Sequence, residues 1–307
     1  MSDFTSNFWD FYIVILTVGA LLFCVWILAV MGKSKKEEKA ANSTTHVWDG
    51  DLTELNNQLP NWWRGLFWVL LIFSVGYLLY YPGLGSFKGL GGWTQTGQFD
   101  KEMAALEAKT KPMYDGFLAM RVEDLAKNQK AMGTAQRIFL NECARCHGSD
   151  AGGAIGFKSL RSGAWNWGGA PIEIEESIAG GRTGVMPPMG EVLGGEPGIK
   201  AVVAYTFSLS GRPHDTNLVA KGETLFEENC AVCHGADGKG MKEIGAPDLT
   251  DNVWDYGSSE KAVMRIVEFG HNSELDEGGF AMPAYKGVLS EGQIHLLTAY
   301  VWGLTNR

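Results

Sequence analysis

The chain has 307 residues, of which 45% are apolar and 20% charged, and its formal net charge is −9. This length suffices for two small domains with further segments. The acidic balance argues against a nucleic-acid-binding protein, and 11 Trp, 10 Pro and 40 Gly spread along the chain argue against a coiled coil or a disordered tail. Four of the five cysteines form two Cys-x-x-Cys pairs, each followed by His, which leaves Cys24 alone.

Residues 11–31 form the first apolar run. They contain no charge, and 21 residues match the roughly 20 that cross a bilayer as a helix. Asp3 and Asp10 precede the run and lysines follow it, the reverse of a signal peptide. We predict a transmembrane helix, with a cleaved signal peptide as the alternative.

A second apolar run covers residues 64–81, ends at Pro82, and is just long enough to span a bilayer. Aromatic residues flank both ends, as in interfacial belts: Trp62 and Trp63, then Tyr77, Tyr80 and Tyr81. We predict a second span. The alternative is a buried core helix, because the run is short and contains Gly76.

The connection between the runs, residues 32–63, carries four lysines and is followed by Arg64, whereas the first ten residues carry no Lys or Arg. The positive-inside rule therefore places the connection in the cytoplasm and both chain ends outside. Residues 82–97 are a glycine-rich tether that completes a membrane anchor over residues 1–97.

Residues 98–132 are rich in Ala, Lys, Glu and Met and predict a helical spacer of one or two helices, broken near Pro112. We find no chemistry in this segment.

The rest of the chain is a repeat. Residues 138–153 match residues 225–240, with the two Cys-x-x-Cys-His motifs 87 positions apart. Three more stretches recur in the same order: residues 159–168 with 248–257, 186–193 with 282–289, and 204–210 with 299–305. Two copies of one small helical domain are predicted, at 133–212 and 213–307, with a joint near residues 210–217.

The two motifs consist of Cys143, Cys146 and His147, and of Cys230, Cys233 and His234. Two cysteines at this spacing can both bond one porphyrin, and the adjacent imidazole can ligate its iron, so each motif predicts a covalently bound c-type haem. A zinc ribbon and a thioredoxin-like redox pair are the alternatives, but neither explains the histidines, nor the methionines of the Met-Pro pairs described next.

A Met-Pro pair recurs at Met186 and Met282, and a thioether would complete a closed, low-spin haem iron. Met189 is the rival ligand in the first repeat, although it aligns with Tyr285 and is expected to pack. His271 is the rival to Met282. Whether a methionine of one repeat serves the haem of the other stays open.

Aromatic residues recur near the motifs and are expected to wall the porphyrin, with N–H or O–H groups for a propionate: Trp165, Trp167, Trp254 and Tyr256. Arg182 is a further candidate for a propionate. His46, His214 and His295 are expected at the surface or in packing.

No other catalytic constellation is found, and ligands on both iron faces leave no open site, so the haems are expected to transfer electrons. Covalent haem attachment fits an oxidising compartment, which agrees with a periplasmic position after residue 81. Residues 98–307 have a net charge of −8, which suits either a basic redox partner or plain solubility.

The stretch 47–63, VWDGDLTELNNQLPNWW, followed by the second apolar run and two haem domains, resembles the CcoP (FixP) dihaem subunit family of cbb3-type cytochrome c oxidases. The resemblance covers essentially the whole chain. It implies a mainly α protein: two transmembrane helices followed by two tandem class I cytochrome c domains. The stretch is then expected to dock the chain on the oxidase at the cytoplasmic membrane surface.

The resemblance further implies iron ligation by His147 with Met186 and by His234 with Met282. Electrons would pass from a soluble or membrane-bound donor cytochrome c to the monohaem subunit and then to the oxygen-reducing haem and copper subunit in the bacterial inner membrane. The chain itself would be no enzyme. Many relatives have only the second span, so the first helix is expected to be accessory. A free-standing dihaem shuttle and a dihaem peroxidase are the alternative functions.

Overall fold

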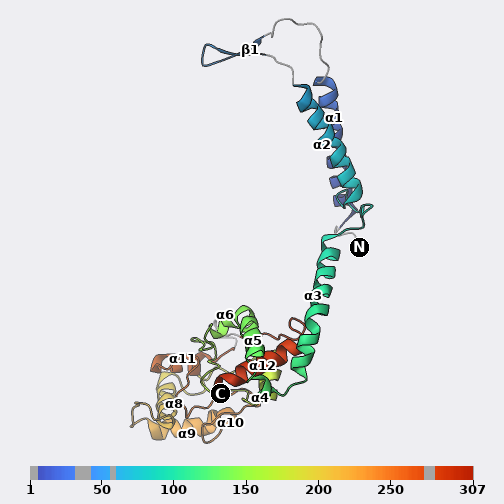
Figure 1. Cartoon of the computed structure of the whole chain (residues 1–307). Coiled ribbons are helices and arrows are strands. Elements are labelled where there is room, and N and C mark those ends of the chain that lie inside the picture. Colours follow the sequence, from blue (N-terminus) through green and yellow to red (C-terminus); the bar gives the residue numbers. More distant parts are fainter. Residues whose placement is uncertain (1–5, 32–42, 56–59, 273–280, 307) are drawn as a thin grey trace. The chain divides into compact units, whose positions relative to one another are not determined.

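The computed structural model describes residues 6–31, 43–55, 60–272 and 281–306. It is mainly helical, as predicted (Figure 1). The chain divides into two compact units, Met1–Lys109 and Thr110–Arg307, which are described separately.

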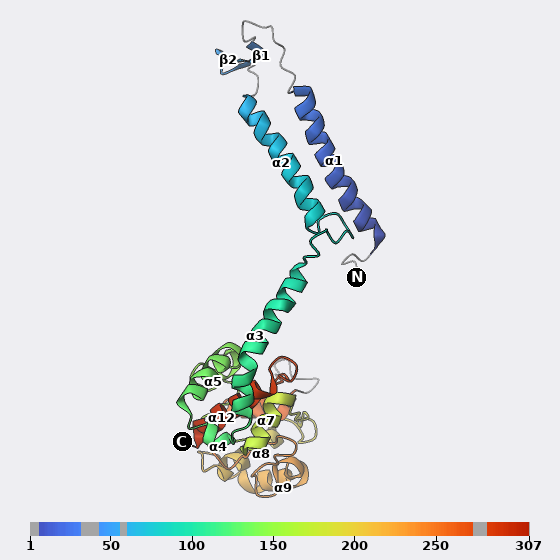
Figure 2. The same ribbon diagram turned by 45° about the vertical axis from the view of Figure 1, so that its right-hand side comes forward.

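Two long helices dominate the first unit, α1 (Asn7–Met31) and α2 (Asn61–Tyr80). They lie side by side in Figures 1 and 2. Both are long and apolar enough to cross a membrane, and they begin a few residues before the predicted spans. Every side chain of α2 is at least partly exposed, which is the opposite of the buried core helix that was the alternative.

A short antiparallel hairpin lies in the connection between these helices, formed by β1 (Ser43–Trp48) and β2 (Leu52–Leu55). The turn contains Asp49 and Gly50, both with positive φ, of 51° and 87°. Sequence analysis missed the hairpin, although Asp-Gly between strand-forming residues is its usual signal. Residues 32–42 and 56–59 of the connection lie outside the described residues.

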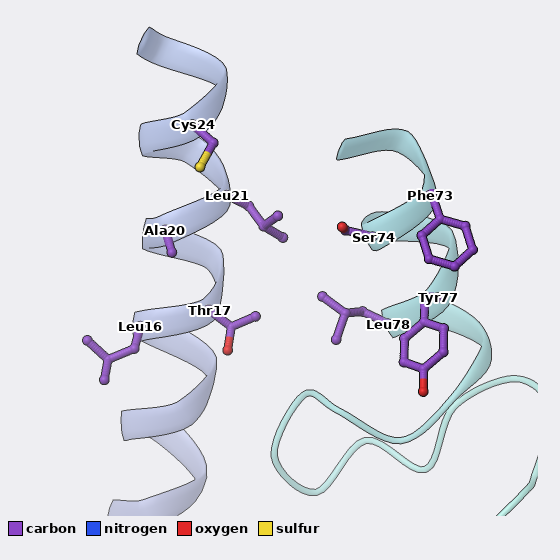
Figure 3. A pocket seen from close by; sticks show the side chains of 9 residues that line it. All are labelled: Leu16, Thr17, Ala20, Leu21, Cys24, Phe73, Ser74, Tyr77 and Leu78. Atoms are coloured by element: carbon purple, nitrogen blue, oxygen red, sulfur yellow. The ribbon is translucent and has the colours of Figure 1, made fainter. Parts of the chain in front are cut away.

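A cavity of about 570 Å³ separates α1 from α2 (Figure 3). Apolar side chains form most of its wall. Thr17, Ser74 and Tyr77 add three hydroxyl groups, and Cys24 lies at its edge. Ser74 donates to the carbonyl oxygen of Leu70 within its own helix. The cavity therefore brings no group of titratable or metal-binding side chains together.

The predicted spacer starts with α3 (Gln95–Leu118), which continues through Pro112 without a break. The expected interruption near Pro112 is wrong. Proline removes one backbone donor and frees the carbonyl four residues earlier, but residues 108 and 112 are both exposed, so water can satisfy that carbonyl. The segment continues with α4 (Val122–Leu125) and then α5 (Gln129–Glu142), whose first turn is capped by the Asn128 side chain.

The remaining helices of the second unit occur in the same order in both repeats. They are α6 (Ala144–His147), α7 (Pro171–Gly180), α8 (Glu196–Leu209), α9 (Val219–Asn229), α10 (Ala231–His234), α11 (Glu260–Phe269) and α12 (Glu291–Thr305).

The two repeats exchange their last helices. α12, from the second repeat, packs on α5 and α7 of the first, while α8, from the first repeat, packs on α9 and α11 of the second. In Figure 2 the red α12 accordingly lies among green and yellow-green helices. The connection from α8 to α9 has only nine residues, and short connections favour packing between consecutive helices. The repeats at 133–212 and 213–307 are therefore not separate packing units.

Each exchange creates an apolar core. One core joins Phe139 and Ile178 to Leu297 of α12, and the other joins Val202 and Phe207 of α8 to Val267. A third cluster packs the spacer side chains Phe117 and Leu125 against Leu296 and Ala299. The second part of the spacer is thus a layer of the core rather than a free connection.

Candidate haem sites

The two Cys-x-x-Cys-His motifs have nearly the same backbone. Cys143 has φ −109° and ψ −34°, Cys230 has φ −108° and ψ −34°, and each precedes a four-residue helix. The amide of His147 donates to the carbonyl of Cys143 at 2.9 Å, and that of His234 to the carbonyl of Cys230 at 3.0 Å. The repeat seen in the sequence is therefore a repeat of local structure at the sites.

A backbone carbonyl orients each histidine ring. His147 Nδ1 lies 2.8 Å from the carbonyl oxygen of Lys158, and His234 Nδ1 lies 3.1 Å from that of Pro247. Because a carbonyl oxygen only accepts hydrogen bonds, Nδ1 donates in both rings and Nε2 keeps the lone pair that binds a metal. Sequence reasoning did not identify Lys158 or Pro247.

Burial sets the protonation of the free side chains at both sites. It raises the pKa of the Cys143 and Cys230 thiols to about 11, with the Glu142 carboxylate contributing at Cys143. Burial also lowers the pKa of His234, although its hydrogen bond to Pro247 opposes the shift. The neutral imidazole favoured at His234 is the form that ligates iron.

The methionine loops cross between the repeats. Met282 pairs with Arg182 through two backbone hydrogen bonds of 2.9 and 3.0 Å, and Met186 pairs with His271 through two of 2.9 Å. Arg182 follows α7 and His271 follows α11, which are the equivalent third helices of the two repeats. Each Met-Pro loop is therefore held by the other repeat.

The side chains follow the same exchange. Met282 and Cys143 both pack against the core of α5, α7 and α12, whereas Met186 and Cys230 both pack against the core of α8, α9 and α11. This arrangement differs from the expected pairs, His147 with Met186 and His234 with Met282. The reason is the helix exchange, which carries each Met-Pro loop to the neighbouring motif.

Two glycines make this crossing possible. Gly181 and Gly270 have φ of 69° and 77°, and a Cβ at either would run into the carbonyl of Met282 or Met186, respectively. Their backbone conformation is one that other residues rarely adopt. These glycines are a signal of the crossing that sequence analysis did not use.

The rival ligands have other partners in the structure. Met189 packs in the same core as Met186, and its counterpart Tyr285 donates a hydrogen bond to the carbonyl of Glu142 at 2.8 Å. His271 is buried, with Nε2 2.8 Å from the hydroxyl oxygen of Tyr256. Its backbone lies beside Met186, not beside Met282.

Residues with a suitable polar group remain for a haem propionate. Within the described part of the chain, Arg212 Nη1 and Trp254 Nε1 are buried and have no hydrogen-bond partner. The Arg212 guanidinium lies over the Phe207 ring, 4.2 Å from its centroid, and over the Trp254 ring at 5.0 Å, so the two unpartnered donors are neighbours. Two buried donors without acceptors fit the carboxylates of a haem at the second motif.

The other predicted wall residues have mixed outcomes. Trp165 packs against the same core as Cys143, and Trp254 packs against the same core as Cys230. Arg182 is stacked on Trp167 at 4.9 Å and donates to the Ser177 hydroxyl at 2.9 Å, so it already has partners. Arg212 is thus the better propionate candidate. Its counterpart Arg307 ends the second repeat in the same way and lies outside the described residues.

A zinc site would need several ligands together. Across residues 6–31, 43–55, 60–272 and 281–306, no group of three or more His, Cys, Asp or Glu side chains is placed to hold a metal ion. The motif cysteines Cys143 and Cys230 pack on different cores. The arrangement suits one porphyrin for each motif and not a shared zinc ion.

Comparisons with known proteins match every major segment. Three family models match: "N-terminal domain of cytochrome oxidase-cbb3, FixP" at residues 40–88, "Cytochrome C oxidase, cbb3-type, subunit III" at 130–205, and "Cytochrome c" at 219–305. The chain is 44% identical over 305 residues to the cbb3-type cytochrome c oxidase subunit CcoP of Rubrivivax gelatinosus, covering 99% of this chain and 97% of the relative. It is 35% identical to subunit FixP of Sinorhizobium medicae and 31% identical to subunit CcoP of Rhodobacter capsulatus; each alignment covers 89% of this chain, and 97% and 99% of those relatives.

Proposed function

Because the chain belongs to the CcoP/FixP family of cbb3-type cytochrome c oxidase subunits, we propose that it carries two covalently bound c-type haems and acts as the electron inlet of that oxidase. It is membrane-anchored and contains two cytochrome c domains. Oxygen reduction and proton pumping belong to the partner subunits in this proposal. Each haem, when bound, supplies one-electron chemistry at its iron.

The proposed ligand sets are crossed. Cys143 and Cys146 would attach the first haem, and His147 and Met282 would ligate its iron, while Cys230 and Cys233 would attach the second, with His234 and Met186 as its ligands. The observation that carries this proposal is the paired anchoring of each site: a histidine oriented by a backbone carbonyl, and a methionine loop held by the other repeat.

The chain's own residues favour electron transfer over bond chemistry. A carbonyl-bound Nδ1 keeps each imidazole in one orientation, and the apolar cores beside Cys143 and Cys230 exclude water from that side. With a histidine and a methionine both held at each site, a bound iron would have no free position for oxygen or peroxide. Fixed ligands also limit the rearrangement that accompanies a change of iron charge.

The proposed topology places residues 32–63 in the cytoplasm and the N-terminus and both haem domains in the periplasm, from the lysine-rich connection. The proposed partners are the oxidase catalytic subunit, the monohaem cytochrome c subunit and a donor cytochrome c. Residues 47–63, which include the end of β1, the turn and β2, are proposed to dock on the oxidase at the cytoplasmic surface.

Purification of the full chain from membranes in mild detergent tests this function. We expect copurification with a haem and copper oxidase, two covalent haems per chain, and reduction of both by a donor cytochrome c. Isolation without oxidase subunits would indicate a free-standing shuttle, and hydrogen peroxide turnover by the chain would indicate a peroxidase.

A further inference from the structure

A partly buried ion pair joins the two repeats near the haem sites. Lys158 Nζ lies 2.9 Å from Asp255 Oδ2 and 2.9 Å from Asn166 Oδ1, and the side chains of Lys158 and Asp255 are only 19% and 11% exposed. Asn166 Nδ2 lies 3.4 Å from the same Asp255 oxygen. Charges this buried are screened by salt far less than surface charges.

The pair breaks the symmetry of the repeats. Asn166 and Asp255 occupy equivalent positions and meet across the junction, but the position equivalent to Lys158 is Pro247. The first repeat thus contributes the cation of the pair, and the second repeat contributes the carboxylate. Lys158 and Asn166 also line a cavity of about 460 Å³, which lies between residues 158–166 of the first repeat and residues 239–253 of the second.

Each member of the pair is linked to a residue of a different haem site. The carbonyl of Lys158 accepts the hydrogen bond from His147. Asp255 directly follows Trp254, whose buried Nε1 has no partner at the second site. The backbone carbonyl of Asp255 accepts from the amide of Gly156 at 2.7 Å, which fixes it against the first repeat.

The effect of such a pair on stability is small, because desolvation of both charges offsets their attraction. The electric field of the two charges has a larger effect, which is on the reduction of a nearby iron. A cation near an iron favours the reduced state, whereas a carboxylate favours the oxidised state, because reduction removes one positive charge.

We propose, on the basis of the function proposed above, that the Lys158–Asp255 pair biases the sharing of electrons between the two haem sites. Lys158 is a positioning residue that favours the electron at the His147 site, and Asp255 disfavours it at the His234 site. One site is oxidised as the other is reduced, so no further reactant is required. Electrons then enter at the second motif and leave from the first.

Redox titration of the holoprotein, with the haems followed optically, tests this bias. Lys158→Met should lower both midpoint potentials, mainly that of the His147 site, and Asp255→Asn should raise both, mainly that of the His234 site. At an effective dielectric constant near 20, one charge within about 10 Å changes a reduction equilibrium about tenfold, which is about 59 mV. The double variant should reduce the preference for the His147 site more than either single variant, because both changes act on that preference in the same direction.

Lys242→Met is the matched control. Lys242 also forms an ion pair between the repeats, with Glu173 at 2.6 Å, but its side chain is 59% exposed. Its loss should leave both potentials unchanged. Lys158→Arg, which keeps the charge, should also leave them nearly unchanged.

Opposite shifts in the two single variants support the bias. Shifts in one direction, or none, with both haems bound and low-spin, would overturn it and leave the proposed function intact. A wild-type chain without two haems would instead contradict the proposed function. If Lys158→Met does not accumulate, Asp255→Asn decides alone, because it is isosteric and matches the asparagine of the first repeat.

Discussion

The first and second haem motifs have nearly identical backbones, yet their surroundings differ in charge. His147 is oriented by the carbonyl of a lysine and His234 by that of a proline. Residues 133–212 carry seven basic and seven acidic residues, whereas residues 213–307 carry seven basic and 15 acidic ones, so the whole excess negative charge lies in the second repeat. Duplication has thus kept the geometry that holds a haem and varied the electrostatics that set its potential.

Removal of one motif gives the largest expected effect on this comparison. Cys143→Ser with Cys146→Ser should abolish covalent attachment at the first site, because both thioethers are lost, and should reduce the chain from two covalent haems to one. Haem stain and haem content per chain measure the change. Cys24→Ser is the control and should leave the content unchanged, since Cys24 lies in α1.

Removal of the other motif gives a one-haem chain that directly tests the crossing. In a Cys230→Ser and Cys233→Ser background, only the His147 site is expected to hold haem. Met282→Ala should then convert that haem from low-spin to high-spin in its optical spectrum, because the thioether is lost, while Met186→Ala should leave it low-spin.

The opposite outcome, loss of the low-spin spectrum in Met186→Ala alone, would show that each haem is ligated by the methionine of its own repeat. In the two-haem chain, Met189→Ala serves as a control for Met186→Ala. It removes a neighbouring side chain from the same core, so it tests whether packing alone changes the spectrum.

Sequence reasoning reached the two spans, the motifs and the repeated Met-Pro pairs because each depends on a local pattern. It did not reach the helix exchange. The last helices of the two repeats share an Ala-Tyr pattern, at Ala204 and Ala299, and this similarity does not indicate which core each helix joins. The short connection between α8 and α9 determines that α8 packs on the second repeat. This constraint comes from the length of the connection and not from the residue types in the helices.

The propionate candidates show the same limit. The sequence offers Arg182 as a further propionate candidate, with nothing in its spacing to prove the role, and the structure gives it Ser177 and Trp167 as partners. Arg212 lies at the joint between repeats, far from the second motif in sequence, and only packing brings it to Trp254. The hairpin turn at Asp49 and Gly50, by contrast, was readable from the sequence and was missed.

The crossing also rests on backbone that only glycine adopts easily. Gly181→Ala should destabilise the holoprotein by about 2 kcal/mol or more, because the φ of 69° is strained for alanine and its Cβ would meet the Met282 carbonyl. Thermal or denaturant unfolding measures the loss. The adjacent Gly180→Ala is the control: it has open space and should be neutral or stabilising by up to about 1 kcal/mol. Equal effects of the two substitutions would argue against a strained crossing.

The smallest expected effect concerns the two arginines. Arg212→Gln should lower the midpoint potential of the second haem, because it removes a cation beside the proposed propionate. The expected shift is less than about 59 mV, which corresponds to a tenfold change in the reduction equilibrium. Arg182→Gln should leave both potentials unchanged, since that guanidinium is already bonded to Ser177 and paired with Glu176. A larger shift from Arg182 than from Arg212 would reverse the assignment. Equal and small shifts at both haems would indicate that Arg212 acts through general charge rather than through one propionate, because a direct contact changes mainly the haem that it touches.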